Sequence, residues 1–238
     1  LVRTLQQVLV PPAPPDIPGL ELEAVYRPAG NGAEVGGDFY DVFELGPDDW
    51  VITVGDVRGK GIGAAVLTAL ARHTVRGAAV RLPCPSDILS ALNDVLLRDA
   101  SDRFCTVVAV RVQRASGGWK ATICCGGHPL PLLQRRGLPP ALVGRPGSLL
   151  GVFAGPTLHD VEVELRPGDE LLLYTDGVTE GRREDGTFFG DERFARSVAA
   201  HSGGARRLVD GTLEDVLAFQ AGNPRDDTVV VALRVPES

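Results

Sequence analysis

The chain has 238 residues, of which 44% are hydrophobic, and its formal net charge is −7. This length and composition suffice for one large domain with a full core, whereas the negative charge argues against nucleic acid as a partner. No apolar run approaches the roughly 20 residues that a membrane-spanning helix needs, so we expect a soluble domain that makes no membrane contact.

The N-terminal stretch predicts a linker followed by the folded domain. Apolar residues recur at helical spacing in LVRTLQQVLV, and the following PPAPPDIPG cannot continue a helix. We therefore predict a connecting helix and proline-rich linker over 1–19 and the main domain over 20–238. The chain contains no methionine, so we expect a fragment or a processed form, with a sensory or dimerising region upstream.

The next elements alternate between hairpins and helices. LELEAVYRP has the alternation of a strand, and FYDVFEL, a Gly-Pro-Asp-Asp turn and WVITVGD predict a hairpin. A strongly apolar helix is expected over 62–80. Ser86 and Asp87 are predicted to cap a second helix that runs to about Arg98.

The second half continues as a meander. FCTVVAVRV, WKATICC and PLLQR predict three strands, and VEVEL, ELLLYT and TVVVALRV predict three more around helices near 191–201 and 205–220. Because hairpins outnumber strand-helix-strand crossovers, the pattern favours an α+β fold: two mostly antiparallel sheets packed together, with helices outside.

The four cysteines are interpreted as reduced thiols. They form no C-x-x-C pair, and three of them lie in apolar runs where cysteine acts as a small hydrophobe. Reduced thiols indicate a cytoplasmic protein.

Several aspartates lie directly beside apolar strands. Because strand ends meet at the rim of a sheet, such acids can gather at one point, where they would repel one another without cations. Oxygen ligands without a nearby histidine or cysteine favour Mg²⁺ or Mn²⁺ over zinc. The alternative is a set of unrelated turn and cap residues. The aspartates are Asp38, Asp41, Asp56, Asp176, Asp226 and Asp227.

The stretch GDVRGKGIG, residues 55–63, is not predicted to be a nucleotide loop. Its glycines have the wrong spacing for a phosphate-binding loop, and Lys60 is followed by glycine rather than serine or threonine. His128 in GGHPLP could be imagined as a base but is interpreted as a turn residue.

Five motifs in order resemble one family. VGGDFYDVF, GDVRGKGIGAAVLTA, CCGGHPLPLL, LLLYTDGVTE and PRDDTVVVAL are similar to the bacterial SpoIIE/RsbU-type branch of the PPM metal-dependent serine/threonine phosphatases. The resemblance implies a β-sandwich flanked by helices in α-β-β-α layers. It also implies a phosphorylated STAS-type anti-sigma-factor antagonist as substrate, hydrolysed by a metal-bound hydroxide.

The resemblance assigns site residues for two Mn²⁺ or Mg²⁺ ions. Asp56 would bridge the ions, the Val57 carbonyl would be a ligand, and Asp176 and Asp227 would hold the second ion, with Asp226 as the alternative to Asp227. Asp38 and Asp41 would ligate through water or support a further ion.

The phosphate ligand and the activity leave alternatives. Arg58 and Lys60 are candidates for holding the phosphate, because the arginine of eukaryotic relatives has no evident counterpart. The alternative to an enzyme is a catalytically inactive module that binds a signalling partner. A homodimer is also compatible with the sequence.

Overall fold

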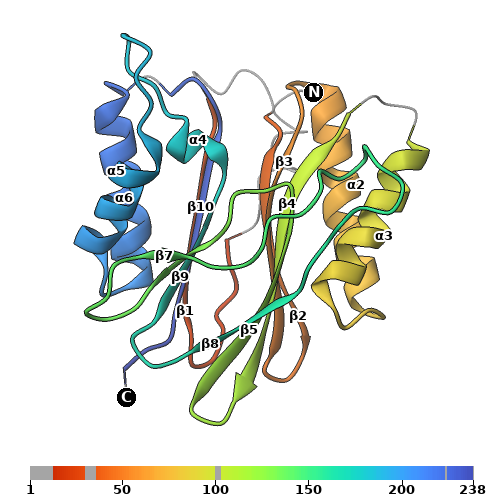
Figure 1. The fold of residues 1–238 in the computed structure, drawn as a ribbon, viewed down its shortest axis with the longest axis horizontal. Helices are drawn as coiled ribbons and strands as arrows, with labels where there is room; N and C mark the ends of the chain where they lie inside the picture. Colours follow the sequence, from red (N-terminus) through yellow and green to blue (C-terminus); the bar gives the residue numbers. More distant parts are fainter. Residues whose placement is uncertain (1–12, 30–35, 100–102, 223, 238) are drawn as a thin grey trace.

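The protein, described by a computed structural model over residues 13–29, 36–99, 103–222 and 224–237, is a sandwich of two five-stranded antiparallel sheets. Figure 1 shows the sheets face to face with helices on both outer sides, as the sequence predicted. One sheet has the order β1-β10-β9-β6-β7, with bounds Glu21–Arg27, Thr228–Arg234, Glu170–Tyr174, Leu132–Gln134 and Ala141–Leu142. The other has the order β2-β3-β4-β5-β8, with bounds Asp38–Gly46, Asp49–Val57, Cys105–Ala115, Gly118–Gly126 and Val161–Leu165.

Two helices cover each outer face. Helices α2 (Ile62–Ala79) and α3 (Pro85–Arg98) pack on the sheet that contains β3, and α5 (Gly190–His201) and α6 (Ala205–Phe219) pack on the sheet that contains β10. The short helix α4 (Asp176–Thr179) follows β9 directly. Strand β7 and helix α4 were not expected from the sequence, because each is too short to show a period.

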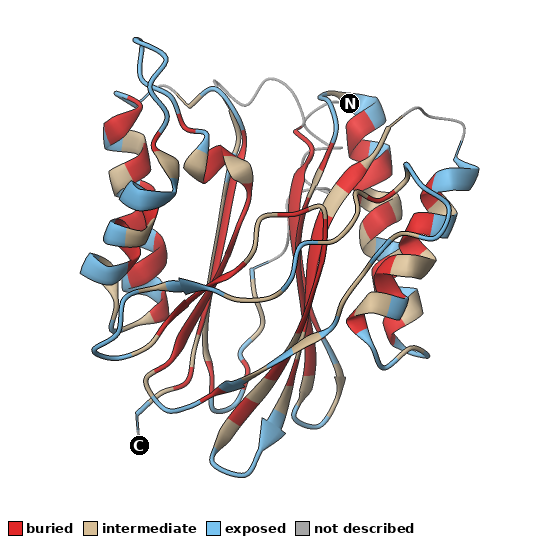
Figure 2. Ribbon diagram, viewed as in Figure 1, coloured by how far each residue is buried: buried red, intermediate tan, exposed pale blue. Residues whose placement is uncertain are grey.

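Three apolar layers hold this arrangement together. The central layer fills the space between the sheets, and one further layer lies under each helix pair. Figure 2 shows the buried residues along the strands and on the inward sides of the helices. The period-two alternation of β2 explains how one strand serves two layers, since Tyr40 and Val42 enter the central layer while Phe39 and Phe43 face α2.

Helix α3 begins at least two residues earlier than predicted. Pro85 is its first residue, and neither Ser86 nor Asp87 caps it, because the N-cap residue is Cys84 without a side-chain cap. Proline is favoured at the first helical position, where its missing N–H would have no intrahelical partner.

The described part of the predicted linker packs on the sandwich. Ile17 is buried in the central layer, and the Trp119 indole donates a hydrogen bond to the carbonyl of Gly19 (3.2 Å). Ordered packing therefore starts before residue 20. The connecting helix predicted within 1–12 lies outside the described residues.

Two further features bear on the sequence predictions. Cys105, Cys124 and Cys125 are buried free thiols, and burial raises the pKa of each to about 12. Within the described ranges, none of the helices combines the length and the apolar character needed to cross a bilayer.

Candidate metal centre

The strand order brings acids from both sheets to one edge. Strand β3 ends where β2 begins, and β9 ends where β10 begins, because each pair is antiparallel. The hydrogen bond between Thr175, just after β9, and Asp38, at the start of β2, places these ends at one edge of the sandwich. Figure 1 shows this edge at the top, beside α4. The pairing register of β2 and β3 sets Asp38 directly opposite Asp56. One sheet therefore supplies two adjacent acids.

The other sheet reaches this pair through Thr175. The Thr175 hydroxyl donates to Oδ2 of Asp38 (2.6 Å) and accepts from the N–H of Val229 (2.9 Å). Thr175 is fully buried and immediately precedes Asp176, the first residue of α4. This contact connects the two sheets at the start of the loop that carries Asp176.

Asp227 lies against Gly36, in the segment that leads into β2 of the other sheet. Its Oδ1 accepts a hydrogen bond from the N–H of Ala29 (2.7 Å), and a Cβ added to Gly36 would overlap its Oδ2. A Cβ added to Gly37 would overlap the Val57 carbonyl oxygen and would lie 2.7 Å from Oδ1 of Asp56. Gly36 and Gly37, which have no side chains, therefore lie close to groups from both sheets.

The same close packing joins Asp176 to Asp227. A Cβ added to Gly177 would overlap the carbonyl oxygen of Asp227. Asp56, Asp176 and Asp227 are therefore neighbours in the fold, together with Asp38 and the Val57 carbonyl. The sequence suggested these acids; it did not suggest that the glycines beside them are required for their approach.

The acids raise one another's pKa values. Burial and then the charge of Asp56 raise the pKa of Asp38 well above its usual range. Burial and then Asp176 raise the pKa of Asp56 to about 6. Burial is also the main cause of the raised pKa of Asp176 and of Asp227. The site therefore concentrates negative charge in a partly dry environment.

The chemistry of these groups fits divalent cations. All are oxygen donors, and among the described residues no lysine or arginine forms an ion pair with Asp38, Asp56 or Asp176. Hard cations such as Mg²⁺ and Mn²⁺ neutralise such a cluster. The acids are neighbours, but their side chains do not point at one common position. In the described ranges, no group of three His, Cys, Asp or Glu side chains has a geometry that could hold a metal ion.

Asp41 lies on the other face of β2. Its carboxylate is 1% exposed and accepts hydrogen bonds from Nε (2.5 Å) and Nη2 (2.6 Å) of Arg76, with Arg72 at 3.6 Å. Because side chains alternate along a strand, Asp41 shares the face of Phe39 and points toward α2. The structure thus places Asp41 in an ion pair with a helix, apart from the other acids.

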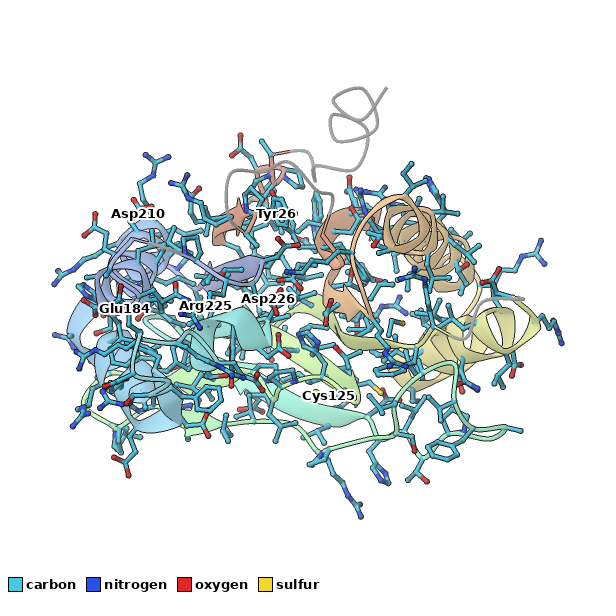
Figure 3. All side chains as sticks on the ribbon, turned by 90° about the horizontal axis from the view of Figure 1, so that it is seen from above. Tyr26, Cys125, Glu184, Asp210, Arg225 and Asp226 are labelled. Carbon is cyan, nitrogen blue, oxygen red and sulfur yellow. The ribbon has the colours of Figure 1, made fainter. Side chains whose placement is uncertain are left out.

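The candidate phosphate ligands lie on the loop between β3 and α2. The Lys60 ammonium is 3.3 Å from Oδ1 of Asp226, and both side chains are largely exposed. Figure 3 shows Asp226 beside Arg225 near the middle of the molecule, between the two helix pairs. Arg58 instead stacks over the ring of Phe104, 5.3 Å from its centroid. The positive φ values of Gly59 and Gly61, 100° and 84°, give this loop its tight course.

His128 lies in a bend just after β5, as interpreted from the sequence, but its side chain is buried. Its side chain is 5% exposed, and burial lowers its pKa to about 3. Its Nδ1 lies 2.9 Å from the Thr106 hydroxyl, and its Nε2 lies 3.0 Å from the Tyr174 carbonyl oxygen. This burial and these two contacts were not apparent from the sequence, because neither partner is near His128 along the chain.

Comparison with known proteins now decides the family. The family model described as "Stage II sporulation protein E (SpoIIE)" matches residues 46–236, which is most of the chain. The chain belongs to the SpoIIE family. The resemblance seen in the sequence motifs is thereby confirmed.

Curated relatives cover this SpoIIE-family chain almost completely. It is 28% identical to Protein IcfG of Synechocystis over 97% of its own length and 40% of that protein. It is 24% identical to the phosphoserine phosphatase RsbU of Bacillus subtilis over 98% of its length and 69% of RsbU. The chain thus spans less than half of IcfG and about two thirds of RsbU.

Solved structures share the fold. The RsbU and RsbW domains of Rv1364c from Mycobacterium tuberculosis match with a TM-score of 0.77 and 27% identity, over 97% of this chain and 63% of that one. The catalytic domain of the serine/threonine phosphatase PstP in complex with two manganese ions matches with a TM-score of 0.59 and 16% identity, over 92% and 100%. The fold of this chain is accordingly that of the PPM phosphatases.

Proposed function

We propose that this chain is a metal-dependent protein serine/threonine phosphatase domain that hydrolyses phosphoserine or phosphothreonine on a regulatory protein. One observation carries the proposal: acids from both sheets lie together around Gly36 and Gly37 with no ion-pairing cation among the described residues. Family membership and the phosphoserine phosphatase RsbU among the relatives support the reaction class.

The proposed roles follow from placement. Asp56, the Val57 carbonyl, Asp176 and Asp227 would hold two Mn²⁺ or Mg²⁺ ions. Such ions, when bound, activate water and neutralise phosphoryl oxygens. Asp38 would be held by the Thr175 hydroxyl so that its free oxygen faces Asp56. Lys60, paired with the exposed Asp226, is better placed than Arg58 to meet an anionic substrate at this edge.

The substrate class is also a proposal. The sequence resemblance implies a phosphorylated STAS-type anti-sigma-factor antagonist, and RsbU supports phosphoserine rather than phosphotyrosine. Hydrolysis of a phosphoserine STAS protein faster than of an unrelated phosphoserine protein would support this choice. Equal rates on both would contradict it.

The enzyme proposal is tested with manganese and variants of the acids. We expect manganese-dependent hydrolysis of p-nitrophenyl phosphate that is lost in Asp56→Asn and Asp176→Asn. Asp210→Asn on the exposed side of α6, well away from Asp226 in Figure 3, is the matched control and should keep wild-type activity. No hydrolysis by the wild-type protein at saturating manganese would refute the proposal. Partner binding without metal binding would favour an inactive binding module.

A further inference from the structure

His128 has a defined protonation state set by its two partners. The Tyr174 carbonyl oxygen can only accept a hydrogen bond, so Nε2 of His128 carries the proton and donates to it (3.0 Å). Nδ1 is then an acceptor, and the Thr106 hydroxyl donates to it (2.9 Å). Both ring nitrogens of this buried side chain are therefore used by the fold.

Two glycines allow the imidazole to reach this place. A Cβ on Gly126 would lie 2.9 Å from the Leu150 side chain, and a Cβ on Gly127 would lie 2.6 Å from that of Leu149. Gly127 also has a φ of 69°, which a residue with a side chain rarely adopts. The end of β5 thus packs closely under the 149–150 segment and turns His128 inward.

The partners of His128 adjoin the acids of the candidate site. Thr106 lies directly opposite Asp56 in the register of β3 and β4. Tyr174 is the last residue of β9 and precedes Thr175 and Asp176. One imidazole therefore connects the strand position beside Asp56 in one sheet with the strand end that carries Asp176 in the other.

We propose that His128 is a positioning residue that fixes the separation of Asp56 and Asp176, and thereby the affinity of the site for divalent cations. The inference rests on the proposed function, because it concerns the same site. The hydrogen-bond partners of His128 are Thr106 and Tyr174, so it acts on the acids through these two residues. Residues that orient metal ligands change metal affinity by about 10- to 100-fold when replaced.

Three substitutions separate the effect of the His128–Thr106 hydrogen bond from that of the His128–Tyr174 hydrogen bond. His128→Gln retains a donor at the position of Nε2 and loses the acceptor for Thr106. His128→Asn retains only the Nδ1 side and loses the bond to Tyr174. Thr106→Val removes the hydroxyl with little change of volume. His73→Gln, at an exposed position on α2, is the matched control.

The test is calorimetric titration of the metal-free protein with Mn²⁺, alongside thermal unfolding. We expect the Kd for manganese to rise about 10- to 100-fold in His128→Asn, and about threefold or less in His128→Gln. Thr106→Val should give a smaller rise than His128→Asn, and His73→Gln should give none. Activity at saturating manganese should be largely restored in each folded variant, since the acids remain.

The outcomes distinguish this inference from the proposed function. A wild-type protein that neither binds manganese nor hydrolyses a phosphate ester refutes the proposed function itself. A folded His128→Asn with wild-type manganese affinity, even if its Tm is lower, overturns the positioning role and leaves the enzyme intact. Should His128→Asn fail to fold, Thr106→Val decides: a folded Thr106→Val protein with wild-type manganese affinity overturns the inference.

Discussion

Gly36→Ala tests the crowded contact between Gly36 and Asp227. The added methyl group would occupy the position of Oδ2 of Asp227, so the carboxylate must rotate away. Rotation breaks the hydrogen bond that Oδ1 accepts from Ala29 (2.7 Å) and the weaker contact of Oδ2 with the Tyr26 hydroxyl (3.4 Å). We therefore expect Gly36→Ala to displace the Asp227 carboxylate from the acid cluster and to lower the free energy of unfolding.

The magnitude follows from these contacts. A hydrogen bond to a charged group contributes about 1.5–3 kcal/mol, and replacing glycine by alanine at a permitted φ returns about 0.4–1 kcal/mol by restricting the unfolded chain. The net loss is about 1–2 kcal/mol, which lowers the Tm of a chain of this size by roughly 2–8 °C. Displacing a proposed metal-holding acid should lower activity by about 10- to 100-fold.

The control for this experiment lies at the opposite end of β2. Gly46→Ala adds a methyl group with no neighbour within 4 Å and no positive φ, so it should leave activity unchanged and raise stability slightly. Manganese-dependent hydrolysis of p-nitrophenyl phosphate and thermal unfolding measure both variants. A Gly36→Ala protein with activity and manganese affinity within twofold of wild type would refute the placement of Asp227 in the site.

Two further predictions concern buried ionisable groups. The pKa of His128 is lowered to about 3, so its neutral form contributes stability that is present above pH 6.5 and is lost as the pH falls toward 3. Urea unfolding between pH 7 and pH 4 should therefore show a steeper loss of stability in the wild type than in His128→Gln. Parallel stability profiles of the two proteins would contradict this prediction. Asp41→Asn should lower the free energy of unfolding by about 3 kcal/mol, because it leaves the partly buried Arg72 and Arg76 without their acid. The Kd of Asp41→Asn for manganese should stay at the wild-type value in calorimetry, and a tenfold weaker Kd would place Asp41 in the metal centre after all.

The fold could be predicted because its signals are local. Alternating apolar residues and short polar turns mark each hairpin, and acids next to apolar runs fall at sheet edges by the geometry of strands. The same alternation also separates Asp38 from Asp41. The two are three residues apart, so they face opposite sides of β2, and a count along the strand predicts this without coordinates.

Other features depend on contacts that the sequence does not display. The partners of His128 lie 22 and 46 residues away, and Thr175 meets Asp38 across a separation of 137 residues. The close approach of Gly36 to Asp227 likewise arises only when the two sheets pack. Glycine and histidine each have several common roles, so composition alone could not select these ones.

Because each sheet supplies part of the candidate metal centre, the central apolar layer between the sheets sets the distance between the acids of one sheet and those of the other. Tyr40, two residues along β2 from Asp38, and Val231, four residues after Asp227, both belong to that apolar layer. Stacked sheets lie about 10 Å apart, and protein interiors are packed too tightly to absorb a lost methyl group without movement. We therefore expect that trimming such a side chain changes the spacing of the acids in the candidate metal centre as well as the melting temperature.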